Sequence, residues 1–503
     1  MSLLKHILNT IGGNKMTQNT VKKYFGKTNL WLIVILLCAA FLRFYHLDFQ
    51  SMWMDELYTM VVSNPAMSWA AFHKELIARE GFPHLYFIIL KIFYFFFGFT
   101  SFTARSVSAI AGIASVYALF LVGKALYNSK TGLVAALLIT VSNYHIYISQ
   151  DARPYTLYFL FVCLSFYRLI LFIKNTTWKN ALYYAVFTGL LLNFNFFALI
   201  NVFSQVVILA LILVLLPQQE RIDFVKKSAV SGAIILGMFA INYQKFIVLM
   251  NYKKFWVSPP QPDSFSKIFK TFFGDSEIVL YLIFPLLLYY IFILFKNKEE
   301  EIFNYKTLLN NKLFFGFIIL FVWFFVMFSF LMIKSYGKIS YLLTRYFLSL
   351  MPVLFIIIAI SIVHIKGKIK QGIVLFVVTF YMFIHLVVVT KQYTTVKHAQ
   401  YREAAAFVLK NNTEKIPIYS NQAYWYRFYF KDNAIKPKEL SLNKLYEKYK
   451  KDSILPQKFW YIDAFKRFDS TNLATKTFFN KKYNIKKIFK GHKAWAELYE
   501  VRK

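Results

Sequence analysis

Two adjacent acids, Asp55 and Glu56, are the residues of this chain best suited to chemistry. They follow directly on its first long hydrophobic segment, 30–47, in a half of the sequence where most other charges are basic. A carboxylate at a membrane–water boundary can act as a general base or as a metal ligand. The pair could equally be solvated acids in the first turn of a helix, where the helix dipole stabilises negative charge.

A second candidate is the turn Gln150-Asp151-Ala152-Arg153-Pro154-Tyr155. A helix start explains Asp151 as the cap and Pro154 as a first-turn residue. It does not explain Arg153, because an arginine on the outer side of a membrane opposes the usual distribution of charge. Such a residue is expected to have a partner, and a phosphate matches the guanidinium fork.

The third candidate runs from Lys334 to Lys338 and continues to Arg345 and Tyr346. These side chains could anchor the chain at the membrane interface. They could also supply further contacts to a lipid-linked phosphate. His84 is a weaker candidate, because a lone histidine is more often a hydrogen-bonding residue than a ligand. The sequence contains no metal-ligand spacing, phosphate-binding glycine loop or nucleophilic-serine motif, so it does not indicate ATP-driven chemistry.

The composition shows what must position these residues. Hydrophobic residues make up 58% of the 503-residue chain and aromatic residues 20%. Many hydrophobic stretches are long enough to cross a bilayer, which predicts a polytopic membrane protein. The net charge of +35 does not indicate nucleic-acid binding, because the Lys and Arg lie mainly in short loops and in the C-terminal tail. Cys38 and Cys163 both fall within hydrophobic segments, so no disulfide framework is expected.

The charges of the loops predict the topology of the chain. The hydrophobic segments are 30–47, 82–98, 103–123, 132–149, 154–173, 181–196, 198–216, 228–250, 278–295, 313–333, 346–364 and 371–390. If all of them crossed, several strongly basic loops would lie outside the cell. Reading 82–98 as a juxtamembrane helix on the outer surface removes this conflict. We therefore expect about eleven crossings, a cytoplasmic N-terminus and an extracytoplasmic C-terminus.

Three regions follow from this topology. Residues 1–29 are expected to form a cytoplasmic segment before a retained signal-anchor helix. The transmembrane domain is expected to span 30–391, with an outer loop at 48–102 that carries juxtamembrane helices. Residues 392–503 are expected to form a small extracytoplasmic α/β domain. Its predicted elements are a helix at 402–409 and strands at 416–419, 459–462 and 496–501.

These stretches, in this order, resemble the GT-C membrane glycosyltransferases, in particular bacterial relatives of protein O-mannosyltransferases and of the lipid A aminoarabinose transferase. The most specific match is Ser149-Gln150-Asp151-Ala152-Arg153-Pro154-Tyr155, which is similar to the family's Ser-Gln-(Glu/Asp)-Ala-Arg-x-Tyr turn. The stretch Phe82-Pro83-His84-Leu85-Tyr86 departs from the usual His-Pro-Pro-Leu-Tyr. The other matching stretches are Asp55-Glu56, Ala104-Arg105-Ser106-Val107-Ser108-Ala109, Arg345-Tyr346 with Pro352, and Arg402-Glu403-Ala404-Ala405.

The resemblance implies transfer of a sugar from a polyprenyl-phosphate donor, with inversion, on the outer face of the inner (plasma) membrane. The acceptor would be a lipid, a glycan or a protein. Asp55 would be the general base with Glu56 beside it, and Arg153, Lys338 and Arg345 would contact the leaving phosphate. No cofactor is certain, although a divalent metal ion is possible. The implied pocket residues are Trp53, Tyr58, His84, Tyr86, Gln150, Asp151, Tyr155 and Tyr346.

Two other classes of protein act on lipid-linked glycans. A transporter or flippase would need charges within facing membrane helices or two related halves, and the sequence shows neither. An O-antigen ligase or polymerase shares the donor class, but it lacks an early Asp-Glu loop followed by an Ala-Arg-x-Tyr turn. The order of the motifs therefore favours the glycosyltransferase. The identity of the sugar and of the acceptor is left open by the sequence.

Overall fold

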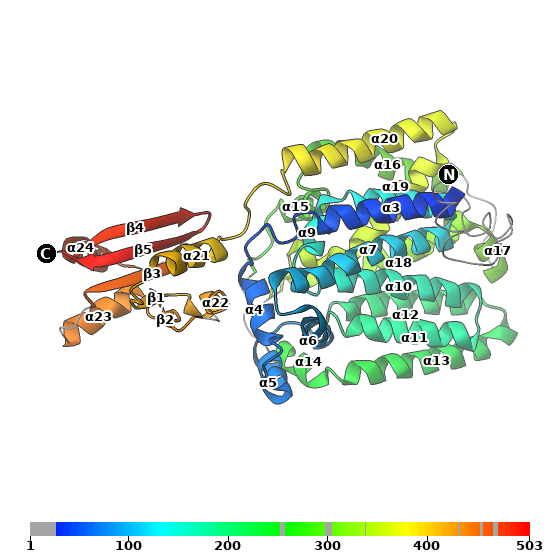
Figure 1. Cartoon of the computed structure of the whole chain (residues 1–503). Coiled ribbons are helices and arrows are strands. Elements are labelled where there is room, and N and C mark those ends of the chain that lie inside the picture. The colour runs from blue at the N-terminus through cyan, green and yellow to red at the C-terminus, as the bar shows by residue number, and fades with distance from the viewer. Residues whose placement is uncertain are drawn as a thin grey trace, which may run out of the picture.

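The computed structural model describes residues 27–251, 257–296, 304–337, 339–430, 433–452, 456–465 and 471–502. Its long hydrophobic helices run side by side in one bundle, and a small domain built on a sheet lies beyond one end of that bundle (Figure 1). Between the two lie the short helices α4 and α5, which follow the first long helix in the sequence.

The helical domain begins with α3 and continues to the π-helical turn η3. Its elements are α3 (Lys27–Phe44), α4 (Met54–Val62), α5 (Trp69–Arg79), α6 (Leu85–Phe97), α7 (Ser101–Leu126), α8 (Ser129–Thr140), α9 (Asn143–Ser149), α10 (Tyr155–Lys174), α11 (Trp178–Leu192), α12 (Ala198–Leu215), α13 (Gln218–Ala240), α14 (Tyr243–Met250), α15 (Ser264–Phe272), α16 (Glu277–Lys296), α17 (Tyr305–Asn310), α18 (Lys312–Ser335), η1 (Thr344–Tyr346), η2 (Leu348–Leu350), α19 (Met351–His364), α20 (Lys368–Ile384) and η3 (His385–Val389).

Within the described ranges, seven helices are long and apolar enough to cross a membrane, and two bent pairs raise that number to nine. The bends are 68° between α8 and α9 and 73° between α13 and α14. Figure 1 places the shorter helices α11 and α19 alongside the long ones. The protein is thus a multi-pass membrane protein. The expected eleven crossings would require α11 and α19 to span as well, and that number stays a prediction.

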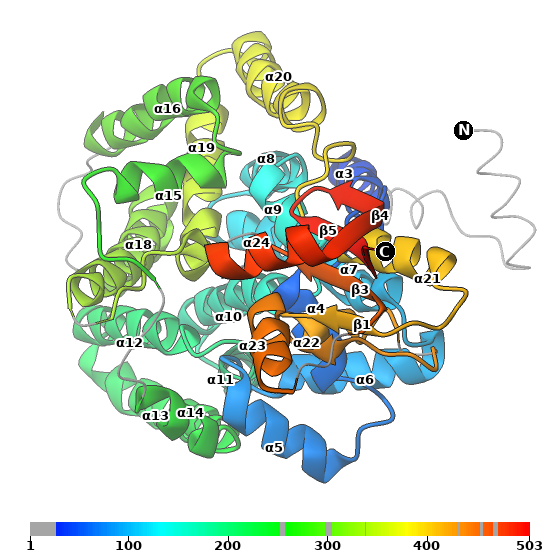
Figure 2. The same cartoon turned by 90° about the vertical axis from the view of Figure 1, so that its left-hand side faces the viewer.

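Helix α6, which covers most of the segment 82–98, lies across the bundle rather than along it. In Figure 1, α6 is seen nearly end-on and the bundle helices are seen lengthwise. In Figure 2, α6 is seen lengthwise and the bundle helices are seen nearly end-on. The helix has 13 residues and ends at Gly98, whose φ of 82° favours glycine. The segment thus does not run parallel to the bundle, and its place on the outer surface stays a prediction.

The C-terminal domain is a five-stranded sheet in the order β2-β1-β3-β5-β4. Strand β1 pairs in parallel with β2 and β3, and β5 pairs antiparallel with β3 and β4. The predicted helix and all three predicted strands are present. The elements are α21 (Tyr401–Asn411), β1 (Ile418–Ser420), α22 (Ala423–Tyr426), β2 (Lys438–Glu439), α23 (Leu442–Asp452), β3 (Lys458–Ala464), α24 (Leu473–Lys482), β4 (Tyr483–Gly491) and β5 (Ala494–Val501).

Alternating residues of β3 build the two cores of this domain, because successive strand residues point to opposite faces. Trp460 and Ile462 pack into the large core that includes α21, whereas Phe459 and Tyr461 pack into a second core with α23 and α24. Figure 2 shows the domain in front of the bundle, over α4 and the ends of the long helices.

Hydrogen bonds fix this domain onto the start of the loop that follows α3. The Arg402 guanidinium donates to the carbonyl oxygens of Asp48 and Phe49, each at 2.8 Å. The backbone N–H of Arg402 donates to Ser51 Oγ at 3.0 Å. The backbone N–H of Met52 donates to a tyrosine hydroxyl of the domain, at 3.2 Å. The C-terminal domain therefore holds the segment that leads directly into α4 and its acids.

Candidate functional site

A cavity of about 1920 Å³ lies where the end of the bundle meets the C-terminal domain. Its wall is formed by α4, the turn before α10, α12, α14, η1 and the α22 region, which are far apart in the sequence. Many of the predicted site residues meet here. Those that line the cavity are Trp53, Asp55, Tyr58, Asp151, Arg153, Tyr155, Arg345 and Tyr346.

Asp55 and Arg345 form an ion pair in the wall of this cavity. Asp55 is the second residue of α4, and its side chain is 34% exposed. Arg345 lies in η1, and its Nη1 is 3.5 Å from Asp55 Oδ2. The guanidinium carbon is 5.6 Å from the ring centroid of Tyr155 and 5.9 Å from that of Tyr346, which is within cation–π range. A carboxylate and a cation thus face the same space.

Glu56, in contrast, is fully buried and is held by Arg105 of α7. Arg105 Nε and Nη2 donate to its two oxygens at 2.8 and 2.7 Å. The backbone N–H groups of Ala152 and Trp53 also donate to Glu56, at 2.9 and 3.3 Å. Burial alone would raise the pKa of Glu56, but the Arg105 guanidinium outweighs it and the pKa lies below the usual value. Glu56 therefore joins α4 to α7 and to the turn before α10, and it does not line the cavity.

Arg153 has a partner within the protein, the carboxylate of Glu80. Its Nη1 and Nη2 lie 3.2 and 3.3 Å from the two Glu80 oxygens. Nη1 also donates to Thr59 Oγ1 at 2.8 Å and to the backbone carbonyl of Asp55 at 3.1 Å. Arg153 is thus a largely neutralised cation that fixes the backbone of Asp55. Arg345 is the more accessible of the two arginines for a phosphate.

Asp151 lies in the cavity wall as a buried acid whose ionised form is disfavoured. The indole Nε1 of Trp53 donates to Asp151 Oδ1 at 2.9 Å. Burial, followed by the negative charge of Glu56, raises the pKa of Asp151 well above its usual range. Its interaction with Trp53 holds the residue that precedes α4, so Asp151 positions the acidic helix.

The raised pKa of Asp151 predicts that Asp151→Asn stabilises the protein at neutral pH. Above about pH 4 the carboxyl ionises more readily in the unfolded chain than in the folded one, so this group costs stability as the pH rises. The side-chain amide of Asn keeps an acceptor oxygen for the Trp53 indole. Because the amide does not ionise, that cost in stability is removed. We expect the melting temperature of the variant to exceed that of wild type by at least about 2 °C at pH 7. The difference should disappear near pH 4, and a lower melting temperature at pH 7 would show that Asp151 is ionised.

Three of the residues expected in the pocket do not line the cavity. His84 Nδ1 lies 3.4 Å from the side-chain oxygen of Asn242, and burial lowers the pKa of this histidine. Tyr86 is fully buried in α6, so the structure makes it a core residue. Gln150 donates to two backbone carbonyls at the C-terminal end of α3. Lys338 lies outside the described residues.

The acids at this site do not fit a divalent metal ion. Within the described parts of the chain, no group of three or more His, Cys, Asp or Glu side chains could hold one. Glu56 is already paired with Arg105, burial disfavours the ionised form of Asp151, and the remaining carboxylate of Asp55 has a guanidinium beside it. We therefore assign no step to a metal ion.

Several residues that line or support the site were not predicted from the sequence. Glu80 is one of the few acids in the loop 48–102. The only indication of it in the sequence was that Arg153 needs a partner. Arg105 was noted only as part of a matching motif. The C-terminal domain supplies Tyr424, Trp425 and Arg427, which no sequence pattern indicated.

Comparison with known proteins shows a shared fold and a partial family match. The family model described as dolichyl-phosphate-mannose-protein mannosyltransferase matches residues 82–243, and no curated protein matches the chain. Over 93% of this chain, ArnT from Cupriavidus metallidurans in the apo state superposes with a TM-score of 0.61 at 11% identity, covering 97% of that protein. The same protein bound to undecaprenyl phosphate superposes with a TM-score of 0.58 at 11% identity. That match covers 93% of this chain and 98% of that protein.

A third structure, the archaeal oligosaccharyltransferase AglB from Archaeoglobus fulgidus with an inhibitory peptide and a dolichol-phosphate, has a TM-score of 0.51 at 10% identity. It is matched over 89% of this chain and 70% of that one. The chain therefore has the fold of ArnT, which confirms the expected GT-C fold. Its family match, over residues 82–243, is to the protein mannosyltransferases.

Proposed function

We propose that this protein transfers a sugar from a polyprenyl phosphate to an acceptor hydroxyl on the extracytoplasmic face of the inner membrane. In this orientation the N-terminus is cytoplasmic. The observation that carries the proposal is the pair of Asp55 and Arg345 in one large cavity, with Oδ2 and Nη1 3.5 Å apart. One group can accept a proton and the other can stabilise a leaving phosphate.

The chemistry is a single displacement at the anomeric carbon. Asp55 takes the proton of the acceptor hydroxyl, whose oxygen forms the new bond to that carbon. The bond from the carbon to the phosphate oxygen breaks with its electron pair, and the lipid phosphate leaves. Because attack and departure occur on opposite faces of the sugar, the configuration inverts. Arg345 neutralises the charge that develops on the departing phosphate.

This geometry requires Arg345 to change partners during the reaction. In the structure its guanidinium lies beside Asp55, which keeps the carboxylate paired. A bound phosphate draws the guanidinium away, and the sugar then lies between the base and the phosphate. Asp55 stays held by its backbone, through the bond that its carbonyl accepts from Arg153. Binding of the donor thus frees the base for the acceptor.

The cavity also has a wall suited to the lipid part of the donor. Phe196, Phe197, Leu249, Met250 and Phe330 line it, and they come from the bundle helices or from the segments beside them. A polyprenyl chain is apolar, so contact with such a surface stabilises its binding. The ArnT and AglB structures that hold undecaprenyl phosphate and dolichol-phosphate support this class of donor.

Arg345→Gln tests the phosphate contact. Loss of a charge-assisted contact costs about 1.5–3 kcal/mol, which is about a 10–100-fold loss of affinity. We therefore expect the variant to bind undecaprenyl phosphate in nanodiscs at least tenfold more weakly than wild type. Arg79→Gln is the matched control, because Arg79 also lines the cavity, carries a 62% exposed side chain and is paired with Glu75. Equal affinities for the Arg345 variant and wild type would remove Arg345 from the donor site.

A further inference from the structure

The C-terminal domain contributes an aromatic wall to the cavity. Helix α22 places Tyr424 and Trp425 there, opposite Tyr58 of α4. The ring centroids of Tyr58 and Trp425 are 6.4 Å apart in an edge-to-face arrangement, and those of Tyr424 and Trp425 are 4.8 Å apart. Three large rings from two domains thus meet at one place in the wall of the proposed active-site cavity.

Two hydroxyl groups of this wall lack a partner. The hydroxyls of Tyr58 and Tyr424 are buried, and neither has a hydrogen-bond partner among the residues that the structure describes. A buried hydroxyl without a partner costs free energy, and such groups are few in native proteins. The two hydroxyls therefore point to a ligand whose own polar groups would pair with them.

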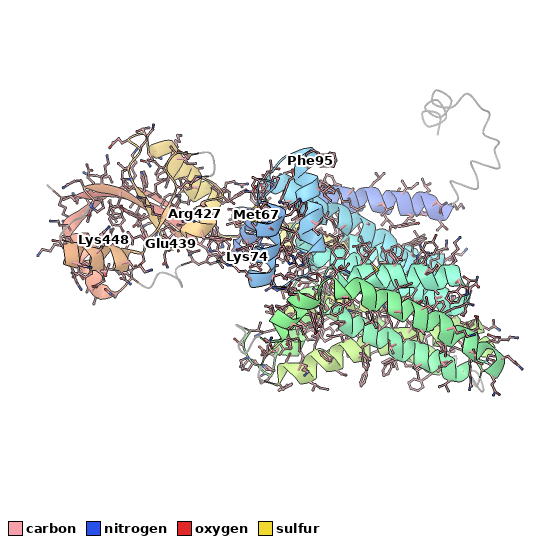
Figure 3. All side chains as sticks on the ribbon, turned by 90° about the horizontal axis from the view of Figure 1, so that it is seen from below. Met67, Lys74, Phe95, Arg427, Glu439 and Lys448 are labelled. Atoms are coloured by element: carbon pink, nitrogen blue, oxygen red, sulfur yellow. The ribbon has the colours of Figure 1, made fainter. Side chains whose placement is uncertain are left out.

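Polar and charged groups surround the aromatic wall. Glu439 of β2 accepts a hydrogen bond from the backbone N–H of Tyr424 at 3.2 Å, and both residues line the cavity. Arg427 lines the same cavity and is exposed. Figure 3 shows Arg427 and Glu439 on the side of the C-terminal domain that faces Met67 and Lys74 of the outer loop. The wall is thus apolar at its centre and polar at its edge.

We infer that Tyr58, Tyr424 and Trp425 form a subsite for a pyranose ring of the acceptor, which makes the acceptor a saccharide or the glycan of a glycolipid. One face of a pyranose carries C–H groups that pack on aromatic rings, while its hydroxyls reach outward and can pair with the two phenols. An acyl chain would leave both phenol hydroxyls unpaired. This inference rests on the proposed function, because it takes the cavity as the place of transfer.

The test uses the full chain in nanodiscs, applied to an array of pyranose oligosaccharides and of peptides. We expect wild type to bind at least one oligosaccharide and Trp425→Ala to bind it at least tenfold more weakly. Tyr424→Phe should also weaken binding several-fold without lowering the melting temperature, since the hydroxyl that it removes has no partner among the described residues. Trp495→Ala is the matched control: Trp495 is a half-buried tryptophan of β5 that does not line the cavity.

The inference is overturned if wild type binds no oligosaccharide, if it binds only peptides, or if Trp425→Ala and Trp495→Ala bind equally well. A fall in melting temperature for Tyr424→Phe with unchanged saccharide binding would give that hydroxyl a purely structural role and overturn it too. Binding of undecaprenyl phosphate is measured in parallel on every variant. If wild type fails to bind undecaprenyl phosphate, the proposed function fails, whereas normal binding of that lipid with no oligosaccharide bound overturns the acceptor subsite alone.

Discussion

Asp55→Asn is expected to lower the rate of sugar transfer by about 10²–10⁴-fold, the contribution that a general base makes to a reaction. The amide is nearly the same size as the carboxylate, but it cannot take a proton from the acceptor hydroxyl. The helix and its buried contacts do not depend on this side chain, because it is 34% exposed and its nearest charged group is Arg345. The purified variant should therefore keep the melting temperature of wild type.

The measurement compares turnover, binding of undecaprenyl phosphate and melting temperature in the same preparations. Asp263→Asn is the matched control, since Asp263 is an exposed acid whose pair with Lys267 lies at the surface. Donor binding should persist in Asp55→Asn, because Arg345 loses a neighbouring carboxylate that competes with the phosphate. Turnover within threefold of wild type would show that Asp55 is not the base.

Glu56→Gln is expected to destabilise the folded protein, in addition to any effect on its chemistry. Removing one partner of a buried ion pair leaves the other charge uncompensated and typically costs about 3–5 kcal/mol. Here the charge left behind would be that of Arg105, whose side chain is only 1% exposed. We expect a large fall in melting temperature and in the amount of folded protein in the membrane.

A double-variant cycle separates the ion pair from other contacts of Glu56. Arg105→Gln alone should be about as destabilising as Glu56→Gln, and the two together should cost clearly less than the sum of the single changes. Strictly additive losses would mean that the two residues act independently. A Glu56→Gln protein with the melting temperature of wild type would contradict the structural role of Glu56 altogether.

The different environments of Asp55 and Glu56 show what local sequence can establish. Successive helix residues are turned by about 100° from one another, so two adjacent acids cannot face the same surface. The sequence predicts a helix start and a carboxylate pair there. Which acid faces solvent depends on where α7 supplies Arg105, and this depends on the packing of the bundle. The resemblance to a family, rather than the residues themselves, favoured Asp55.

Arg153 shows the same limit over a longer distance. The charge pattern indicated that Arg153 needs a partner, and it suggested a phosphate. The structure gives it Glu80, which is 73 residues away in the sequence. No periodicity or local motif relates two residues at that separation, so the pairing could be found only from the fold.

The helices and strands were the most predictable part of the structure. They depend on local composition and hydrophobic period, which the sequence contains. This holds for the long apolar stretches, for the crosswise segment 82–98 and for the helix and strands of the tail. The bends between α8 and α9 and between α13 and α14 were not expected, because each lies within one continuous apolar segment. The aromatic wall of α22 was also missed, since its position depends on how the C-terminal domain lies against the outer loop.

The most direct test of the account is a mass comparison of cell-envelope extracts. Cells that lack the gene are supplied with wild type, with Asp55→Asn or with Asp263→Asn, and their glycolipids and glycans are analysed by mass spectrometry. The account predicts a product in the wild-type and Asp263→Asn cells that is heavier by one sugar residue than its counterpart in the Asp55→Asn cells. Identical extracts from all three, with the proteins equally abundant in the membrane, would contradict it.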